Sequence, residues 1–321
     1  MDREAACSVL RAFGIEPASV REDIPLAGSP ARTVARIAVE DASGAVFIVE
    51  EIDQAKADRK CAIARTAARL RAADPGLPVS TYREHIPGET VLEREGFSFQ
   101  VVSYVSGVPL DREAYLDDDW RGPAMARFLV RMCLAARQAG FEERPETEPF
   151  FLREYARELS ANMEQHDPET LAAVRPVLGY LESGYFTKEM ELPLSFCHGD
   201  YHPVNIIWGE DRIRAVIDWE FSGPKPELYD VANMVGCLGM EDPAALTGPI
   251  VTEFLSVLWR EGDFSGESWQ AFPDLVLALR FAWLSEWLRF REPDMVSLET
   301  TYMDILRTNR DALARAWGIV L

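Results

Sequence analysis

The sequence predicts an α+β fold with two lobes, a small β-rich N-terminal lobe over residues 1–104 and a larger, mainly helical C-terminal lobe over residues 105–321. Two patterns support this division. Residues 33–52 alternate between apolar and polar on both sides of the turn Ala42-Ser43-Gly44, as expected for a β-hairpin. From about residue 120 onward, apolar residues recur every three or four positions, which indicates amphipathic helices.

The other expected elements follow from local start and stop signals. One helix should end at Asp74-Pro75-Gly76, and another should begin at the cap Asp167-Pro168. Helices are expected over residues 1–15, 55–73, 120–139, 150–165 and 168–183, and over most of 228–321. Short strands are expected near residues 79–84, 89–93 and 97–104, and in a second hairpin around Gly209-Glu210-Asp211.

Composition excludes several classes of protein and partner. The formal charge of −20 argues against nucleic acid as a partner, because phosphate backbones attract basic surfaces. No stretch approaches 18 uncharged apolar residues and no signal-peptide pattern opens the sequence, so no membrane partner is expected. The five cysteines are scattered, odd in number and without CxxC spacing, which indicates free thiols in a reducing cytoplasm rather than disulfides or a zinc site.

The stretch CHGDYHPVNIIW, residues 197–208, carries the strongest chemical signal. Its Gly and Pro disfavour regular structure, so it is either a functional loop or a polar turn. The hairpin that leaves from Asn205 and returns with Asp218 would bring both residues to one open end, and their oxygens suit a hard cation such as Mg²⁺. Asp200 is then left to accept a proton from a hydroxyl nucleophile, which is the division of labour that phosphoryl transfer requires.

The motif HGDYHPVN, followed by VIDWE and LYDVAN, strongly resembles the aminoglycoside phosphotransferase and choline kinase family, whose members are distant relatives of protein kinases. The resemblance implies a protein-kinase-like fold and a Mg²⁺-dependent phosphotransferase that uses ATP or GTP to phosphorylate a hydroxyl group of a small molecule. It implies that Asp200 is the catalytic base and that Asn205 and Asp218 hold Mg²⁺. It also implies that His198 and Asp230 hold the catalytic loop in place.

The same resemblance places the nucleotide between the two lobes. The turn that contains Gly28 and Ser29 stands where the family's phosphate-covering loop would be, although with one glycine it reads equally well as a plain turn. The adenine is expected against the linker, hydrogen-bonded by backbone groups from Val102 to Tyr104.

Two residues near the motif have open roles. Glu220 is either a second metal or substrate contact or a solvent-facing charge at the end of a strand. His202 is interpreted as scaffolding of the loop, because no partner lies at the spacing of a zinc site.

One position departs from the family pattern. The family carries a lysine late on the second strand of the first hairpin, where it grips the nucleotide phosphates and pairs with a glutamate on the following helix. Here that position is Glu50, and a shift of one residue offers only Glu51. A carboxylate beside a triphosphate is repelled by about 4 kcal/mol at 4 Å with an effective dielectric near 20, so something must compensate.

Three accounts of this departure stay open. A cation from elsewhere replaces the lysine, either Arg36 on the adjacent strand or Lys56 or Lys60 at the start of the helix. Alternatively the ion pair is inverted, with Glu50 bonded to a helix cation such as Lys60 or Arg65 and the phosphates left to metal and backbone. In the third account the protein is a degenerate kinase that binds a nucleotide or small ligand without phosphoryl transfer.

The acceptor has no shared signature in the sequence. Trp283 and Trp287 lie one helical turn apart with Phe290 nearby, which fits either an aromatic cage for a quaternary ammonium group or an apolar helix face in the core. Choline-like, aminosugar-like and homoserine-like hydroxyl compounds are all compatible with the chain.

Overall fold

The computed structural model describes residues 1–26, 34–112, 114–143, 145 and 147–319, and it confirms the α+β class. The chain divides into two compact units. The first unit comprises Met1–Val108, Ile207–Gly209 and Ile213–Glu220, and the second comprises Pro109–Ile206, Glu210–Arg212 and Phe221–Leu321. The first unit thus recruits two short segments from the middle of the sequence in addition to the N-terminal hundred residues.

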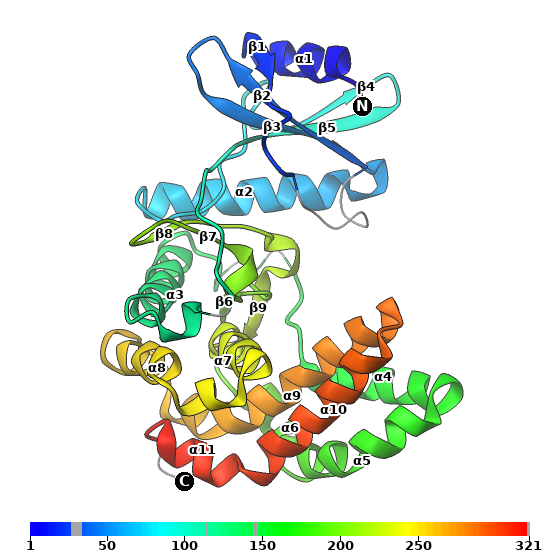
Figure 1. Cartoon of the computed structure of the whole chain (residues 1–321), viewed down its shortest axis with the longest axis vertical. Helices are drawn as coiled ribbons and strands as arrows, with labels where there is room; N and C mark the ends of the chain where they lie inside the picture. Colours follow the sequence, from blue (N-terminus) through cyan, green and yellow to red (C-terminus); the bar gives the residue numbers. More distant parts are fainter. Residues whose placement is uncertain (27–33, 113, 144, 146, 320–321) are drawn as a thin grey trace. The chain divides into compact units, whose positions relative to one another are not determined.

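The first unit is built on a five-stranded sheet with the strand order β1-β2-β3-β5-β4, in which each neighbouring pair is antiparallel (Figure 1). Its strands are β1 (Pro17–Val20), β2 (Ala35–Asp41), β3 (Val46–Ile52), β4 (Val91–Arg94) and β5 (Phe97–Ser103). Its helices are α1 (Arg3–Ala12) and α2 (Ala57–Ala73). The predicted first hairpin and the helix after it are therefore confirmed.

The two faces of this sheet have different roles. Helix α1 packs on one face, where Val39, Val49 and Val101 are fully buried in a common apolar cluster. Strand alternation sends Ile48 and Glu50 to the other face, which α2 covers in Figure 1. Glu50 therefore lies on the face of the sheet that α2 covers.

A second hairpin, formed by β7 (Ile206–Trp208) and β8 (Ile213–Val216), is attached to the first unit. The backbone N–H of Val108 donates to the carbonyl of Trp208 at 2.8 Å, and the N–H of Val216 donates to the carbonyl of Pro78 at 2.8 Å. Gly107 permits this approach, because a Cβ there would lie 2.6 Å from the Ile207 side chain and 2.8 Å from the Trp208 carbonyl. Backbone hydrogen bonds thus tie the returning strand, which leads to Asp218, to the N-terminal unit.

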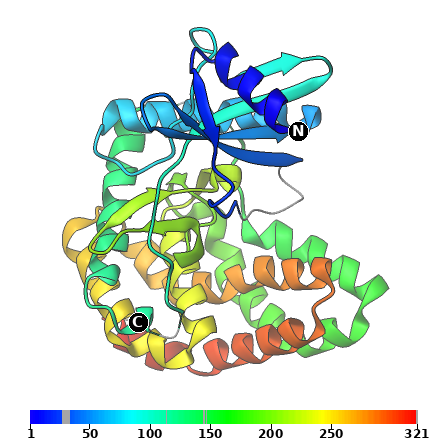
Figure 2. The ribbon, with the colours of Figure 1, turned by 45° about the horizontal axis from the view of Figure 1, so that its top comes forward.

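The second unit is mainly helical, as predicted. Its helices are α3 (Arg121–Gln138), α4 (Leu152–His166), α5 (Pro168–Ser183), α6 (Tyr185–Lys188), α7 (Tyr229–Glu241), α8 (Pro249–Glu261), α9 (Gly266–Phe290), α10 (Pro293–Thr308) and α11 (Arg310–Ala316). Its two strands, β6 (Leu194–Cys197) and β9 (Gly223–Pro226), pair antiparallel. Helix α9 packs against α4, α7 and α10, and Figures 1 and 2 both show it beside α10.

Some elements differ from the expectation. Residues 79–84 do not form a strand; Val79 and Tyr82 instead make isolated bridges to Val216 and Val102. This segment lacks a continuous partner strand, because β4 already occupies the edge next to β5. Strand β9 was not expected, because two of its four residues are prolines and proline cannot donate to a ladder.

One buried ion pair fixes two long helices of the second unit. Arg280 in α9 donates two hydrogen bonds of 2.6 Å to the carboxylate of Glu299 in α10. The two side chains are 1% and 0% exposed, and the indole of Trp287 donates a further hydrogen bond to Glu299. Removing either partner would leave an uncompensated charge in the core.

We predict that Glu299→Ala lowers the free energy of unfolding by about 3–5 kcal/mol, because it leaves the Arg280 guanidinium buried without its carboxylate. Urea denaturation followed by circular dichroism measures this change. The matched control is Asp304→Ala in the same helix. Asp304 pairs with Arg307 at the surface, where their side chains are 64% and 35% accessible. The control should cost less than about 1 kcal/mol, and an equal loss in both variants would contradict the role of the buried pair.

Candidate active site

The HGD loop begins where strand β6 ends, and the first turn of helix α7 holds it. Asp230 in that turn accepts the backbone N–H of His198 at 2.6 Å and that of Gly199 at 2.8 Å. The carboxylate is buried, and its two oxygens each take one donor. A backbone fixed at two successive residues leaves the next residue, Asp200, little freedom of position.

Gly199 is required by the same geometry. Its φ is +85°, a conformation that residues with a Cβ rarely adopt, and a Cβ there would collide with the carbonyl of Phe221. The loop therefore needs glycine both for its backbone angle and for the close approach of another segment of the same unit.

Burial raises the pKa of Asp230 to about 6, against the lowering effect of its two backbone hydrogen bonds. At neutral pH the group is therefore mainly ionised, and the two N–H donors stabilise its charge. The ionised carboxylate is unfavourable in this buried position. We infer that its two hydrogen bonds serve to position the loop.

His198 and Tyr201 complete the scaffold of the loop. His198 is fully buried, and its Nδ1 accepts the backbone N–H of Asp200 at 3.2 Å. The hydroxyl of Tyr201 donates to the carbonyl of Met125 at 3.1 Å, and its ring stacks on Phe128 in the same helix, α3. The structure thus places His198 in the interior, bonded to the backbone of Asp200, and its role in holding the loop in place stays a prediction.

The structure brings Asp200 and Asn205 into direct contact. The amide nitrogen of Asn205 donates to the backbone carbonyl and to the Oδ2 of Asp200, both at 2.9 Å. These bonds turn the amide oxygen, the atom that a cation would bind, away from Asp200. The ring of His202 lies on the other side, with Nε2 3.6 Å from Oδ1 of Asp200. Asp200 is therefore oriented by two neighbours while its side chain stays partly accessible.

Asp218 follows β8 in the first unit and has an unusual backbone. Its φ is +70°, which is uncommon for a residue other than glycine and occurs preferentially at functional sites. Within the described part of the chain, no three His, Cys, Asp or Glu side chains converge as a metal cage. Asn205 and Asp218 each carry an oxygen atom of the kind that Mg²⁺ prefers, and they belong to different units.

The residues around Glu50 form two ion pairs on the α2 face of the sheet. Arg36 and Glu50 are register partners on β2 and β3, and their charged groups lie 2.7 Å apart. Lys60 in α2 lies 2.7 Å from the carboxylate of Glu220. Glu51 points to the α1 face, where it pairs with the amino group of Met1 at 3.0 Å. Glu50 and Glu51 thus lie on opposite faces of the sheet, and each pairs with a different cation.

The nucleotide-binding candidates are only partly described. Gly28 and Ser29 lie outside the residues that the structure describes. Val102 pairs with Ile48 inside the sheet, and the backbone N–H of Tyr104 donates to the carbonyl of Val46 at 2.9 Å. The N–H of Tyr104 is thus already used by the sheet, so any contact of Tyr104 with a nucleobase would come from its ring or its carbonyl.

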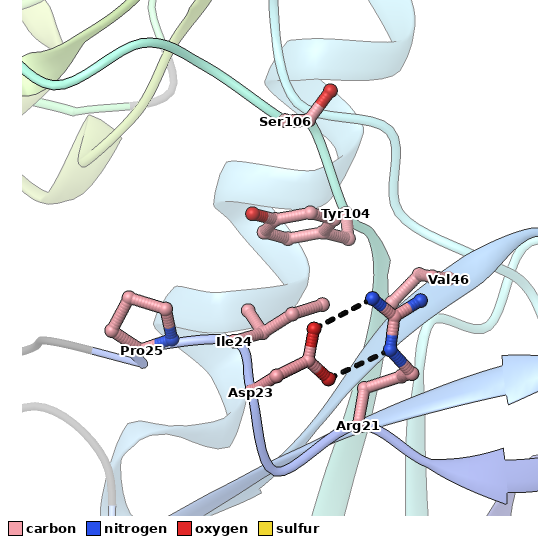
Figure 3. Close-up of a pocket in the computed structure, with 7 residues that line it drawn as sticks. All are labelled: Arg21, Asp23, Ile24, Pro25, Val46, Tyr104 and Ser106. Carbon is pink, nitrogen blue, oxygen red and sulfur yellow. Dashed lines mark hydrogen bonds and ion pairs between the residues drawn. The ribbon is translucent and has the colours of Figure 1, made fainter.

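A pocket of about 430 Å³ opens beside Tyr104, entirely within the first unit (Figure 3). Its lining residues are Arg21, Asp23, Ile24, Pro25, Val46, Tyr104 and Ser106. Arg21 closes one side through two hydrogen bonds to Asp23, of 2.8 and 2.7 Å, which lower the pKa of the Asp23 carboxyl. Val46 and Tyr104 share the sheet face of Glu50 by strand alternation. Sequence reasoning missed Arg21 to Pro25, because an irregular segment between two strands carries no periodic signal.

The two tryptophans of α9 are neither a closed cage nor a fully buried core face. Trp283 donates from its indole N–H to Asn233 at 2.9 Å, and its ring meets His202 edge-to-face at 5.4 Å. The rings of Trp283 and Trp287 lie 5.7 Å apart, and both are half-buried. Phe290 is exposed and does not close a cage around them. Trp283 thus connects through His202 to Asp200.

The fold and the loop together define a protein-kinase-like phosphotransferase. The family profile described as the phosphotransferase enzyme family (APH) matches residues 28–264, well over half of the chain. The protein belongs to this family, as the motifs predicted. Comparison with curated proteins gave no match.

Solved structures share this fold at low sequence identity. Amicoumacin kinase hAmiN, in complex with AMP-PNP, Ca²⁺ and Ami, is 15% identical with a TM-score of 0.68, over 95% of this chain and 94% of that one. APH(2")-IIia, in complex with GDP and kanamycin, is 18% identical with a TM-score of 0.62, over 96% and 99%. Macrolide 2'-phosphotransferase MphH from Brachybacterium faecium is 14% identical with a TM-score of 0.62, over 94% and 98%. These likenesses establish the two-lobed kinase-like fold.

We predict that the protonated form of Asp230 makes a measurable contribution to stability, which is lost as the carboxyl ionises between about pH 4 and pH 6. Its pKa is higher in the folded chain than the ordinary value of 3.8, so the folded state holds the proton longer. This contribution is complete below pH 4 and is lost as the pH rises through about 6, by at most about 3 kcal/mol.

The measurement is urea denaturation of the wild type and of Asp230→Asn from pH 4 to pH 7. The stability difference, wild type minus variant, should fall as the pH rises across this range. A difference that stays constant would show that Asp230 does not titrate with a raised pKa.

Proposed function

We propose that this protein transfers a phosphoryl group from a Mg²⁺-bound nucleoside triphosphate, ATP or GTP, to a hydroxyl group of a small molecule, with Asp200 as the general base. The observation that carries the proposal is the fixed position of Asp200 in a loop pinned by Asp230 at His198 and Gly199. A general base must be held within hydrogen-bond reach of the hydroxyl whose proton it accepts. A partly accessible, ionisable carboxylate on a rigid loop meets this requirement.

Asn205 and Asp218 are the residues that we expect to hold Mg²⁺. When bound, the metal ion would neutralise charge on the phosphates. The chain's own contribution is to present hard oxygen atoms: the Asn205 amide is already oriented by its two bonds to Asp200, and the Asp218 carboxylate is presented by a strained backbone. Among the fold relatives are complexes with AMP-PNP, ADP and GDP, which supports a nucleotide as the donor.

The acceptor is proposed to bind beside Asp200, against His202 and Trp283. His202 lies between the carboxylate and the indole, so an acceptor hydroxyl at Asp200 would lie close to this aromatic side. An indole face suits the apolar face of a ring-shaped acceptor, whose hydroxyl groups project from its edge. The fold relatives carry antibiotics such as kanamycin and hygromycin B, but at these identities they do not assign an acceptor to this chain.

We predict that Asp200→Asn lowers kcat for phosphoryl transfer by about 10²–10⁴-fold, because the amide cannot accept the hydroxyl proton. The amide oxygen can still accept the hydrogen bond from Asn205, so the thermal transition should be retained. The measurement is the initial rate of phosphorylated product formation with any accepted hydroxyl compound.

The matched control for this variant is Asp211→Asn. Asp211 is exposed in the turn between β7 and β8, away from the loop contacts described above. The control should keep full activity. An Asp200→Asn protein that transfers phosphate at the wild-type rate would rule out Asp200 as the base.

A second function is favoured by one observation, the presence of buried Glu50 where the family has its phosphate-gripping lysine. In this alternative the protein is a degenerate kinase that binds a nucleotide or a small ligand without transferring phosphate. Asp200, Asn205 and Asp218 are all present with their supporting residues, and a protein without phosphoryl transfer has no need for the whole set. We therefore place the phosphotransferase first.

The two functions predict different results in a paired screen. A thermal-shift assay with Mg-ATP, Mg-GTP and a panel of hydroxyl metabolites is combined with an assay for phosphorylated product in the same mixtures. A phosphotransferase should show a nucleotide-dependent shift and product with at least one hydroxyl compound. A thermal shift without phosphorylated product in any mixture would support the degenerate kinase. The absence of a shift with either nucleotide would contradict the phosphotransferase, and it would restrict the degenerate kinase to binding a ligand other than these nucleotides.

A further inference from the structure

In this protein a carboxylate stands on the strand where the resemblance predicts a lysine, and a lysine stands on the helix that should carry the partner glutamate. Glu50 lies in β3, and Lys60 lies in the following helix, α2. Gln100 shows that the two residues adjoin: it is the register partner of Glu50, and its side-chain amide donates to the carbonyl of Lys60 at 3.4 Å. A carboxylate from the strand and a lysine from the helix are therefore neighbours in the first unit.

Glu50 and Lys60 have different ion-pair partners. Glu50 takes Arg36 from the adjacent strand at 2.7 Å, and the Glu50 side chain is 9% exposed. A buried carboxylate that loses its cation costs several kcal/mol, so Arg36 is committed to neutralising Glu50. This pair removes the repulsion that Glu50 would exert on a phosphate, but it leaves the attraction to be supplied by another cation.

Lys60 pairs with Glu220, a carboxylate that is close in sequence to the proposed metal ligand Asp218. Its ammonium is 2.7 Å from the carboxylate of Glu220, two residues after Asp218, and the two side chains are 10% and 18% exposed. The phenol of Tyr82 is influenced by a carboxylate from each ion pair. Burial first, and then the carboxylates of Glu50 and Glu220, raise its pKa. The Lys60 ammonium is thus held at the end of the hairpin that presents Asp218.

We propose that Lys60 binds the nucleotide phosphates in place of the missing strand lysine, and that Glu220 holds its ammonium until the nucleotide arrives. The inference rests on the proposed function and names the residue that completes that site. A lysine suits this exchange, since its charge sits on four rotatable methylenes and can move from a carboxylate to a phosphate oxygen without losing an anionic partner. The Glu220 side chain is 18% exposed in this structure, so solvent already reaches it.

The direct test uses an acyl-phosphate derivative of ATP. A lysine Nζ close to the terminal phosphate attacks the acyl carbon, the bond from that carbon to the phosphate oxygen breaks, ATP leaves, and an amide forms on the lysine with loss of one proton. The chain has four lysines, Lys56, Lys60, Lys188 and Lys225, so peptide mass spectrometry can assign the label. We expect the label on Lys60, with labelling suppressed by excess Mg-ATP.

The second test measures the dissociation constant of Mg-AMP-PNP by calorimetry for Lys60→Met and for the control Lys56→Met. Lys60→Met should weaken binding by about ten- to a hundredfold, the range for one hydrogen bond to a charged group. Lys56, one helical turn earlier in the 3₁₀ segment Gln54–Lys56, should leave binding unchanged when replaced. The labelling of the wild type remains decisive even if Lys60→Met does not fold.

The outcomes separate this inference from the proposed function. If the wild type binds Mg-AMP-PNP but the label falls on Lys56, or on no lysine, or Lys60→Met binds as tightly as the wild type, then Lys60 is not the phosphate-binding residue. If the wild type binds no nucleotide at all, the proposed function fails first.

Discussion

The buried carboxylate of Asp230 accepts two successive backbone N–H groups, from His198 and Gly199, and the geometry of the HGD loop depends on this contact. It joins the end of β6 to the first turn of α7, so a strand and a helix that are distant in sequence set one loop. The position of Asp200, and through it that of the Asn205 amide, follows from this anchor. Burial raises the pKa of this carboxylate, so its ionised form lowers the stability of the fold, while its two hydrogen bonds fix the loop.

The placement of charged side chains in the first unit is the second constraint on the structure. In the first unit two cations on the α2 face each meet a carboxylate: Arg36 meets Glu50 and Lys60 meets Glu220. These pairs keep the interior neutral without a nucleotide, and they make the departure at Glu50 compatible with binding a polyanion. In the proposed arrangement, helix α2 and not strand β3 supplies the positive charge for the phosphates, and the proposed role of Asp200 does not depend on it.

The sequence predicted the fold class, the first hairpin, most helices and the family, because periodicity, Gly and Pro signals and a dense motif are all local. It could not predict the pairing of Arg36 with Glu50 or that of Lys60 with Glu220, because both depend on tertiary contacts between residues 14 and 160 positions apart. The contact between Asn205 and Asp200 was also missed; sequence reasoning kept these residues apart as metal ligand and base.

Calorimetric titration of the wild-type protein with ATP, carried out with and without Mg²⁺, tests the central claim most directly. The account predicts one nucleotide bound per chain with Mg²⁺ present and a clear loss of affinity when the metal is chelated, because Asn205 and Asp218 act on the phosphates only through the ion. Equal binding with and without Mg²⁺, or no binding under either condition, would contradict it.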